Sequence, residues 1–287
     1  MNVPAHQFIV LKGRLINLAT PLVMAIINAT GDSFYSSSRN STKDELKFRI
    51  EDAVSQGADI LDIGGCSTRP GATLVGEEEE LERIAQAFTT VRSVAGEYPT
   101  SVDTFRASVA RLAVNDFDCD IINDISAYSL DPDLFSTIIQ LQRTYILTHS
   151  TGIACANDIR MSDNTPEDKF LASVLQFFAK KIDNLRSAGF SKDIIVDPGF
   201  GFGKNLQQNY TLLRNLSLLR CFDEPILTGL SRKSMIYHPL NITAEQALNG
   251  TISLNTLALA NGANILRVHD VAEAVQIRQL YKIYNKL

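Results

Sequence analysis

Eight short apolar runs recur along the chain, and segments with helical periodicity separate them. The runs span residues 22–27, 59–63, 100–102, 120–122, 144–147, 193–196, 224–227 and 263–268. Near-continuous apolar strands are typical of a parallel sheet that is covered on both faces. The chain of 287 residues therefore has the alternation of an α/β protein.

The segments between these runs carry helix signals. Thr42 and Glu45 have the spacing of a capping box in front of an apolar periodicity that continues to Val54. A long helix is predicted over 165–189, with Pro166 at its first helical position. Further helices are predicted at 105–114, 134–141, 207–216, 244–260 and 270–283.

Eight β/α units favour a (β/α)₈ TIM barrel, an α/β fold. A doubly wound open sheet is the alternative, but it would gather polar residues at one switch point. Here polar clusters follow at least seven of the eight runs, as around the carboxyl-terminal rim of a barrel. Residues 8–18 resemble a short β-hairpin that would close the opposite end. No linker interrupts the pattern, so residues 1–287 are expected to form one domain.

Composition argues against nucleic acid, structural zinc and a membrane as partners of this chain. The net charge of −5 argues against nucleic acid as a bulk electrostatic partner. The four cysteines include no C-x-x-C pair, which argues against a structural zinc site. No apolar stretch approaches the ~20 residues of a membrane-spanning helix, and the first residues lack a secretory leader pattern. We expect a cytoplasmic protein that binds no membrane.

Three amide or carboxylate side chains stand at the ends of predicted strands: Asp103, Asn123 and Asp197. Any one of them alone is better interpreted as a helix cap or turn residue. Together at a barrel mouth they suit a flat heterocycle with several N–H donors, because Asp accepts two such bonds and Asn both gives and takes. His149 lies just after the fifth run and is either a catalytic base or a packed polar residue.

Four loops carry a more restrictive pattern, at residues 60–71, 194–204, 228–234 and 264–270. In this order they resemble the loops of the dihydropteroate synthase family, and the similarity runs from about residue 23 to residue 271. The resemblance implies an enzyme that condenses 6-hydroxymethyl-7,8-dihydropterin diphosphate with p-aminobenzoate and releases pyrophosphate. It also implies Mg²⁺ as cofactor and a homodimer.

The resemblance assigns roles to residues of this chain. Those implied to be catalytic are Asp103, Asp197, Lys233, Arg267 and His269. Those implied to hold the pterin are Asp103, Asn123, Asp197, Phe202, Lys233 and Arg267. The diphosphate would contact Asn28, Thr68, Arg69, Arg267 and His269, with Mg²⁺ at Asn28. The p-aminobenzoate would contact Phe34, Thr68, Pro70, Phe202 and Ser231.

The chain departs from the family pattern in three loops. Gly31 stands where Pro is usual, and Cys66 stands where Glu or Gln is usual. Thr148 and Ser150 flank His149 where the family has Met, which removes an apolar wall from the expected pterin pocket. We also expect Arg69 to lower the pKa of the Cys66 thiol.

Other polar residues are expected to play no direct part in binding. They are Asp62, Asp124 and Arg232, interpreted as structural, and Lys204, interpreted as solvated or facing the rim. Two other functions remain open: a pterin-binding methyltransferase barrel, and a pterin-binding protein without catalytic activity.

Overall fold

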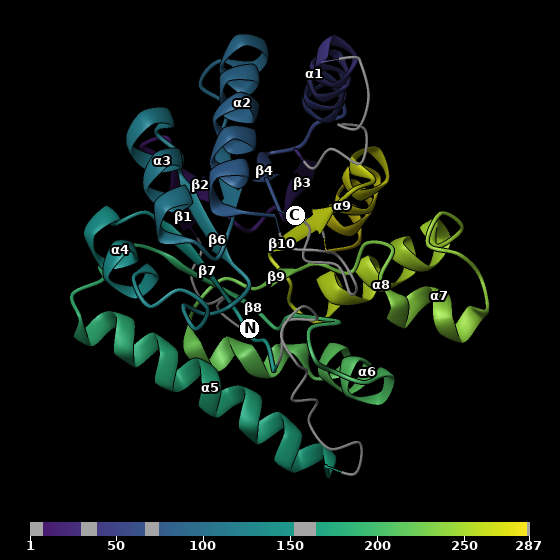
Figure 1. The fold of residues 1–287 in the computed structure, drawn as a ribbon. Coiled ribbons are helices and arrows are strands. Elements are labelled where there is room, and N and C mark those ends of the chain that lie inside the picture. Colours follow the sequence, from purple (N-terminus) through teal and green to yellow (C-terminus); the bar gives the residue numbers. More distant parts are fainter. Residues whose placement is uncertain (1–7, 30–38, 67–74, 152–164, 286–287) are drawn as a thin grey trace.

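The computed structural model describes residues 8–29, 39–66, 75–151 and 165–285. Its eight parallel strands form one sheet in the order β8-β7-β6-β5-β4-β3-β10-β9 (Figure 1). A bridge between Val196 and Ile226 joins the two ends of the sheet and closes the barrel. The strands are β3 (Leu22–Asn28), β4 (Ile60–Gly64), β5 (Thr100–Asp103), β6 (Ile121–Asp124), β7 (Thr144–Thr148), β8 (Ile194–Asp197), β9 (Leu227–Thr228) and β10 (Ile265–Val268). The predicted TIM barrel is confirmed.

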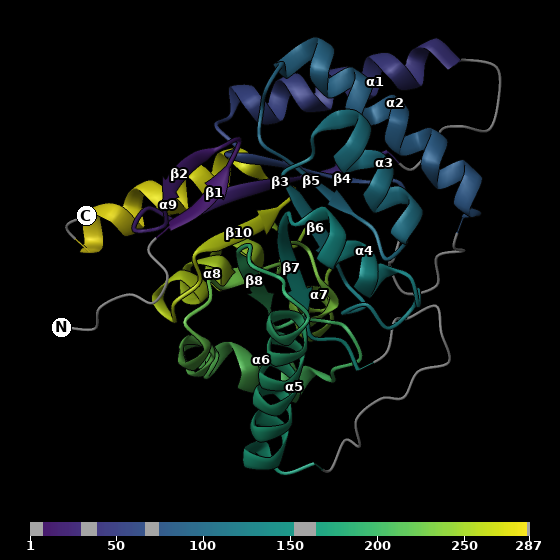
Figure 2. The same ribbon diagram turned by 90° about the vertical axis from the view of Figure 1, so that its left-hand side faces the viewer.

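Helices form the outer layer (Figures 1 and 2). They are α1 (Arg39–Ser55), α2 (Glu77–Ala95), α3 (Ala107–Phe117), α4 (Leu134–Leu141), α5 (Glu167–Ser187), α6 (Leu206–Arg214), α7 (Ser234–Leu240), α8 (Leu248–Ala260) and α9 (Val271–Asn285), with a 3₁₀ helix at Leu216–Phe222. No helix in the described part of the chain combines the length and apolarity needed to cross a bilayer.

The structure moves predicted helix boundaries and adds a helix. The helix α1 begins at Arg39, before the expected capping box at Thr42, and Pro166 is the N-cap of α5 rather than its first helical residue. The helix α2 was not predicted, although four glutamates fill its first turn. Such a run is favourable beside the positive end of a helix dipole and could have identified it.

Two apolar clusters follow from the alternation of side chains along each strand. One cluster packs the outward-facing strand residues against the helices. The other fills the barrel at the amino-terminal ends of the strands, with Met24, Ile60, Ile121, Ile146, Ile195, Leu227 and Ile265. Because this lower layer is apolar and tightly buried, polar side chains inside the barrel can gather only at the carboxyl-terminal mouth.

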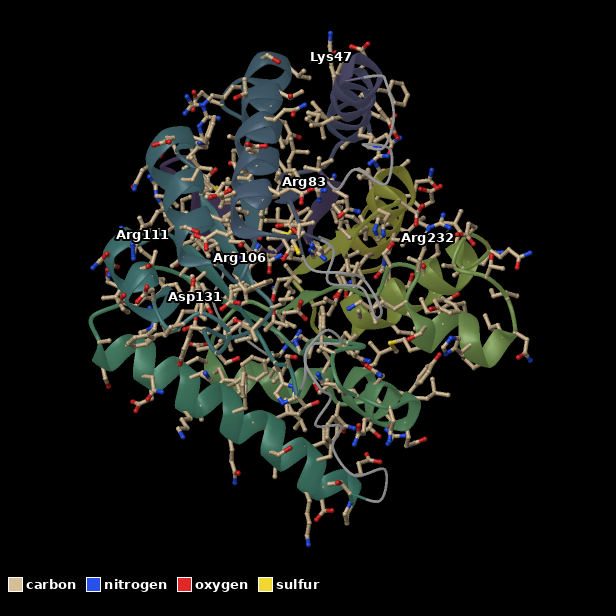
Figure 3. All side chains as sticks on the ribbon, in the orientation of Figure 1. Lys47, Arg83, Arg106, Arg111, Asp131 and Arg232 are labelled. Carbon is tan, nitrogen blue, oxygen red and sulfur yellow. The ribbon has the colours of Figure 1, made fainter. Side chains whose placement is uncertain are left out.

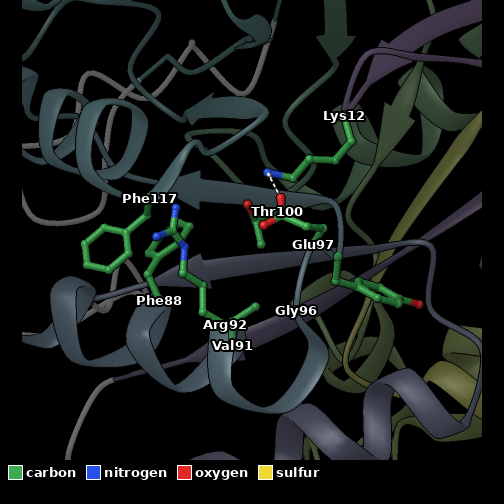
Figure 4. Close-up of a pocket in the computed structure, with 9 residues that line it drawn as sticks. Lys12, Phe88, Val91, Arg92, Gly96, Glu97, Thr100 and Phe117 are labelled. Atoms are coloured by element: carbon green, nitrogen blue, oxygen red, sulfur yellow. Dashed lines mark ion pairs between the residues drawn. The ribbon is translucent and has the colours of Figure 1, made fainter.

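The predicted hairpin is confirmed as β1 (Phe8–Leu11) and β2 (Arg14–Asn17), an antiparallel pair at one end of the barrel (Figure 2). Ile9 and Leu11 are buried in the inner apolar cluster. Lys12 at the turn has a φ of +47°. Its Nζ lies 3.8 Å from a carboxylate oxygen of Glu97, and both residues line a small pocket at the start of β5 (Figure 4). The hairpin therefore closes the end of the barrel opposite the polar mouth.

The buried carboxylate of Asp120 helps to tie the hairpin to the barrel. Asp120, 5% exposed, accepts hydrogen bonds from the backbone N–H groups of Lys12 (2.8 Å) and Thr100 (3.0 Å). We expect Asp120→Ala to lower the free energy of unfolding by about 2–3 kcal/mol, since one buried and one partly buried donor lose their acceptor. Urea denaturation followed by circular dichroism measures this. The half-exposed Asp118, which pairs with Lys12 and Arg143, provides the control. Asp118→Ala should cost less than about 1 kcal/mol, and equal losses would contradict the anchoring role of Asp120.

Candidate active site at the barrel mouth

Polar side chains replace the apolar layer at the carboxyl-terminal end of the barrel. Each follows an inward-facing apolar residue by two positions and so also faces the interior. They are Asp62 after Ile60, Asn123 after Ile121, Thr148 after Ile146, Asp197 after Ile195 and Arg267 after Ile265. The strand register pairs Asp103 with Asn123 and Thr148 with Asp197. The structure thus brings together the predicted pterin-binding carboxylates and amide.

Arg267 is the centre of an ion-pair cluster inside the mouth. Its guanidinium lies 2.6 Å from Asp62 and 2.5 Å from Asp103, and Nε donates to Asp62 at 2.7 Å. Asn123 donates its amide N–H to Asp62 at 3.1 Å. Asp62, interpreted as structural, is a fully buried carboxylate that holds both Arg267 and Asn123 in place. Asp62 follows the inward-facing Ile60 by two residues, and this spacing predicts that its side chain faces the barrel interior.

Burial sets the charge state of this cluster. It raises the pKa of Asp103 above its ordinary value, against the lowering effect of Arg267, and the negative charge of Asp62 adds to the increase. Burial also raises the pKa of Asp197, which Lys233 opposes. Burial alone would lower the pKa of Arg267, but Asp62 and Asp103 raise it instead. The guanidinium therefore stays charged, while Asp103 and Asp197 take up a proton at higher pH than exposed carboxylates do.

The turn after β8 folds back over the mouth. Asp197 accepts the Gly199 N–H at 2.7 Å. Lys204 donates to the carbonyl oxygens of Gly199 (2.7 Å), His149 (3.0 Å) and Phe202 (3.2 Å). The expectation of a solvated Lys204 is wrong: the residue is 8% exposed, and burial lowers its pKa to about 7. Its ammonium group cross-links the end of β7 to the turn.

Lys233 lies against the same turn. Its ammonium group donates to the Phe200 carbonyl and lies 4.6 Å from the centre of the Phe202 ring. Burial lowers the pKa of Lys233 to about 8, an effect that Asp197 partly offsets. Lys233 and Phe202 are thus adjacent, as expected for two residues that would contact one flat ligand.

Ser231 and His269 form a second pair at the rim. His269 donates its backbone N–H to the Ser231 hydroxyl, and its Nδ1 lies 3.2 Å from the same oxygen. His269 is exposed just before α9. Asn28 ends the neighbouring β3, where its carbonyl accepts a 3.4 Å hydrogen bond from Arg49. Arg232, labelled in Figure 3, does not join this pair, as expected. Its guanidinium binds the Asp270 carboxylate and the backbone carbonyls of Ala244 and Glu245 between α7 and α8.

Several predicted contacts lie outside the described residues: Phe34, Thr68, Arg69 and Pro70. The described backbone on either side of residues 67–74 is held by Arg83 of α2 and by Arg106, the N-cap of α3, both labelled in Figure 3. Arg83 donates to the Gly65 carbonyl at 3.1 Å, and Arg106 donates to the Val75 carbonyl at 2.8 Å. Arg106 also pairs with the fully buried Glu80, which accepts the Thr104 hydroxyl at 2.8 Å.

His149 fits the packed alternative better than the catalytic one. It is 3% exposed, and its ring meets Phe177 edge-on with 4.7 Å between centres. Burial lowers its pKa well below the ordinary value, and Lys204 adds to this. A neutral ring enclosed by phenylalanines is a poor site for proton exchange with a bound substrate.

The Arg69 side chain, expected to lower the pKa of the Cys66 thiol, lies outside the described residues. Burial raises the pKa of the Cys66 thiol; Glu80 adds to this, while Arg106 opposes it. Cys119, fully buried, has its pKa raised by burial to about 12. Cys66 is only partly buried, so it is the more accessible of the two thiols.

Comparisons with known proteins agree with this geometry. The family of pterin binding enzymes matches residues 24–269. A dihydropteroate synthase of Haemophilus influenzae is 37% identical over 272 residues, 94% of this chain and 96% of that protein. The Escherichia coli K12 enzyme is 38% identical over 269 residues, 92% of each.

Solved structures of such enzymes superpose closely. A Yersinia pestis dihydropteroate synthase in complex with a sulfonamide drug has a TM-score of 0.86 at 33% identity, covering 97% of this chain and 99% of that one. A Xanthomonas albilineans dihydropteroate synthase with 4-aminobenzoic acid has a TM-score of 0.86 at 34% identity, covering 98% and 99%. The mouth geometry, the family match and these relatives lead to one conclusion: the chain belongs to the family of pterin binding enzymes.

Proposed function

We propose that the chain is a dihydropteroate synthase, which joins 6-hydroxymethyl-7,8-dihydropterin diphosphate to p-aminobenzoate and releases pyrophosphate. The observation that carries this proposal is the joint arrangement at the mouth. Carboxylates, an amide, a guanidinium and an ammonium group meet there in a chain that is 37–38% identical to dihydropteroate synthases over more than nine-tenths of its length.

The pterin ring would bind inside the mouth. Asp103, Asn123 and Asp197 supply acceptors for the N–H groups of the ring, and Lys233 supplies a donor for its carbonyl and ring nitrogen. Phe202 offers an aromatic face beside Lys233. Arg267 lies against this site through its contact with Asp103.

The reaction forms a C–N bond at the exocyclic methylene group. The amine nitrogen of p-aminobenzoate attacks this carbon, the C–O bond to the diphosphate breaks, and the nitrogen then loses a proton to solvent. The leaving group departs with the electron pair, so cations near its oxygens lower the barrier. Arg267, His269 and Arg69 would supply that charge, with Thr68 as a further donor. Ser231, Phe34 and Pro70 would border the p-aminobenzoate.

Magnesium would bind beside Asn28, and its chemistry there is to neutralise charge on the departing pyrophosphate. The donor set fits such an ion, because Mg²⁺ is usually bound by one or two protein oxygens together with substrate phosphates. Within residues 8–29, 39–66, 75–151 and 165–285, no three acidic, histidine or cysteine side chains form a closed metal cage. Asn28 would therefore act as an auxiliary ligand to a metal that the diphosphate brings.

A homodimer and a cytoplasmic location complete the proposal. Several large apolar side chains on α8 and α9 are exposed: Leu257 (50%), Leu280 (68%), Ile283 (75%) and Tyr284 (82%). An apolar surface on neighbouring helices is typical of an interface between subunits. Sedimentation velocity of the purified protein tests the dimer, and a monomer at micromolar concentration would contradict it.

Pyrophosphate release from the pterin diphosphate tests the function. We expect release that depends on p-aminobenzoate and yields dihydropteroate, detected by mass spectrometry. A methyltransferase barrel would instead need a methylated reduced folate and release no pyrophosphate. A non-catalytic protein would bind the pterin without turnover. Either result would reject the proposed activity.

A further inference from the structure

Several buried polar atoms lack a hydrogen-bond partner among the described residues, and one of them is a hydroxyl group that faces the mouth. The Oγ1 atom of Thr148 is buried and makes no hydrogen bond to any described residue, and the side chain is 0% exposed. Buried polar groups in folded proteins are nearly always hydrogen-bonded, so each exception calls for an explanation. The methyl group of the same side chain lies beside the backbone at Gly199, so the hydroxyl occupies a different side of the residue.

The position of Thr148 in the barrel points to the ligand site. It follows the inward-facing Ile146 by two residues and so faces the interior. Its strand β7 runs between the strand of Asn123 and the strand of Asp197, and Thr148 pairs directly with Asp197 in the register. A hydroxyl at this place lies in the row of groups that would contact the pterin, and it can both donate and accept.

We propose that Thr148 is a specificity-determining residue whose hydroxyl bonds to the polar edge of the bound pterin ring. This inference rests on the proposed function and deepens it. The usual methionine of the family offers no such group, so this chain would replace an apolar wall by a hydrogen bond. Burying the hydroxyl without a partner is unfavourable, and a hydrogen bond to the bound ring would offset this penalty.

A matched pair of threonines tests the inference. Thr228 in β9 also has a buried Oγ1 without a partner among the described residues, but it pairs with Leu266 of the outer cluster and so faces away from the mouth. The variants are Thr148→Val, Thr148→Ser and Thr228→Val. The readouts are the melting temperature of the protein alone and calorimetric affinity for 6-hydroxymethyl-7,8-dihydropterin.

Both valine variants should melt at the same temperature as the original protein or higher, because each removes an unsatisfied buried hydroxyl. Thr148→Val alone should bind the pterin about tenfold more weakly, the effect of one lost hydrogen bond. Thr148→Ser and Thr228→Val should stay within about twofold of the original affinity.

The failures are distinguishable. If the original protein binds the pterin and Thr148→Val binds it equally well, the hydroxyl contact is rejected while the proposed function stands. If Thr148→Ser binds as weakly as Thr148→Val, keeping the hydroxyl does not preserve binding, and the inference also fails. If the original protein binds no pterin, the proposed function fails, and this inference fails with it.

Discussion

Gly199→Ala is expected to lower the free energy of unfolding by at least about 4 kcal/mol. Few single substitutions cost this much, and here backbone strain and a steric clash act together. Gly199 has φ +67, and a Cβ added there would lie 2.0 Å from the carbonyl oxygen of His149. That oxygen is backbone, and it is fixed by the 3.0 Å hydrogen bond from Lys204. Relief therefore requires the whole turn to move.

The same change should abolish pterin binding, because the turn positions the site. The N–H of Gly199 donates to Asp197, and Phe202 and Lys204 follow on the same turn. Urea denaturation and calorimetry measure the two effects. Gly189→Ala is the control, since Gly189 has φ +90 and no atom within 4 Å of the added Cβ. It should cost only about 1 kcal/mol from backbone strain, and equal losses at both positions would show that the clash at Gly199 is relieved cheaply.

The strands could be predicted because burial on both faces leaves a clear apolar run. Their carboxyl-terminal ends could not be placed as well, because the last residue of several strands is polar. Asp103, Asp124 and Asp197 each continue the strand by one or two residues beyond the apolar run. The backbones of these residues continue the hydrogen bonding of the strand, while their polar side chains bind other groups. The apolar pattern alone therefore ends the strand too early.

Positions in the site were predictable, but the contacts were not. The family resemblance located Asp103, Asn123, Asp197, Lys233 and Arg267 at one mouth, and the structure places them there. The resemblance did not predict that the guanidinium of Arg267 pairs with two carboxylates, those of Asp62 and Asp103. Such pairing depends on side-chain geometry across several strands, which a one-dimensional pattern does not contain.

Lys204 illustrates the same limit. A lysine after a glycine-rich loop is ordinarily solvated. Here Gly199, Gly201 and Gly203 all adopt positive φ, at +67, +82 and +65. The resulting turn directs carbonyl oxygens inward, and the ammonium group of Lys204 binds three of them. The glycine spacing contained this information, but only the backbone conformation shows where the carbonyls point.

Arg267→Met should reveal how much the mouth depends on one cation. Removing the guanidinium leaves Asp62 and Asp103 side by side without their shared partner. Breaking a buried ion pair in this way costs about 3–5 kcal/mol in the free energy of unfolding. Urea denaturation near neutral pH measures the loss. Arg214→Met is the control, because Arg214 and its partner Glu167 are 63% and 46% exposed at the side chain. That change should cost less than about 1 kcal/mol.

The loss at Arg267 should also depend on pH. Burial already raises the pKa of Asp103, and Arg267 counteracts that effect, so its removal raises this pKa further. Between the ordinary and the raised pKa the folded protein binds a proton that the unfolded chain has released, so the variant becomes less stable as pH rises through this window. The difference from the original protein should therefore be larger at about pH 8 than at about pH 5. A difference that is the same at both values would mean that Asp103 does not carry the uncompensated charge, and that Arg267 contributes through packing or hydrogen bonds instead.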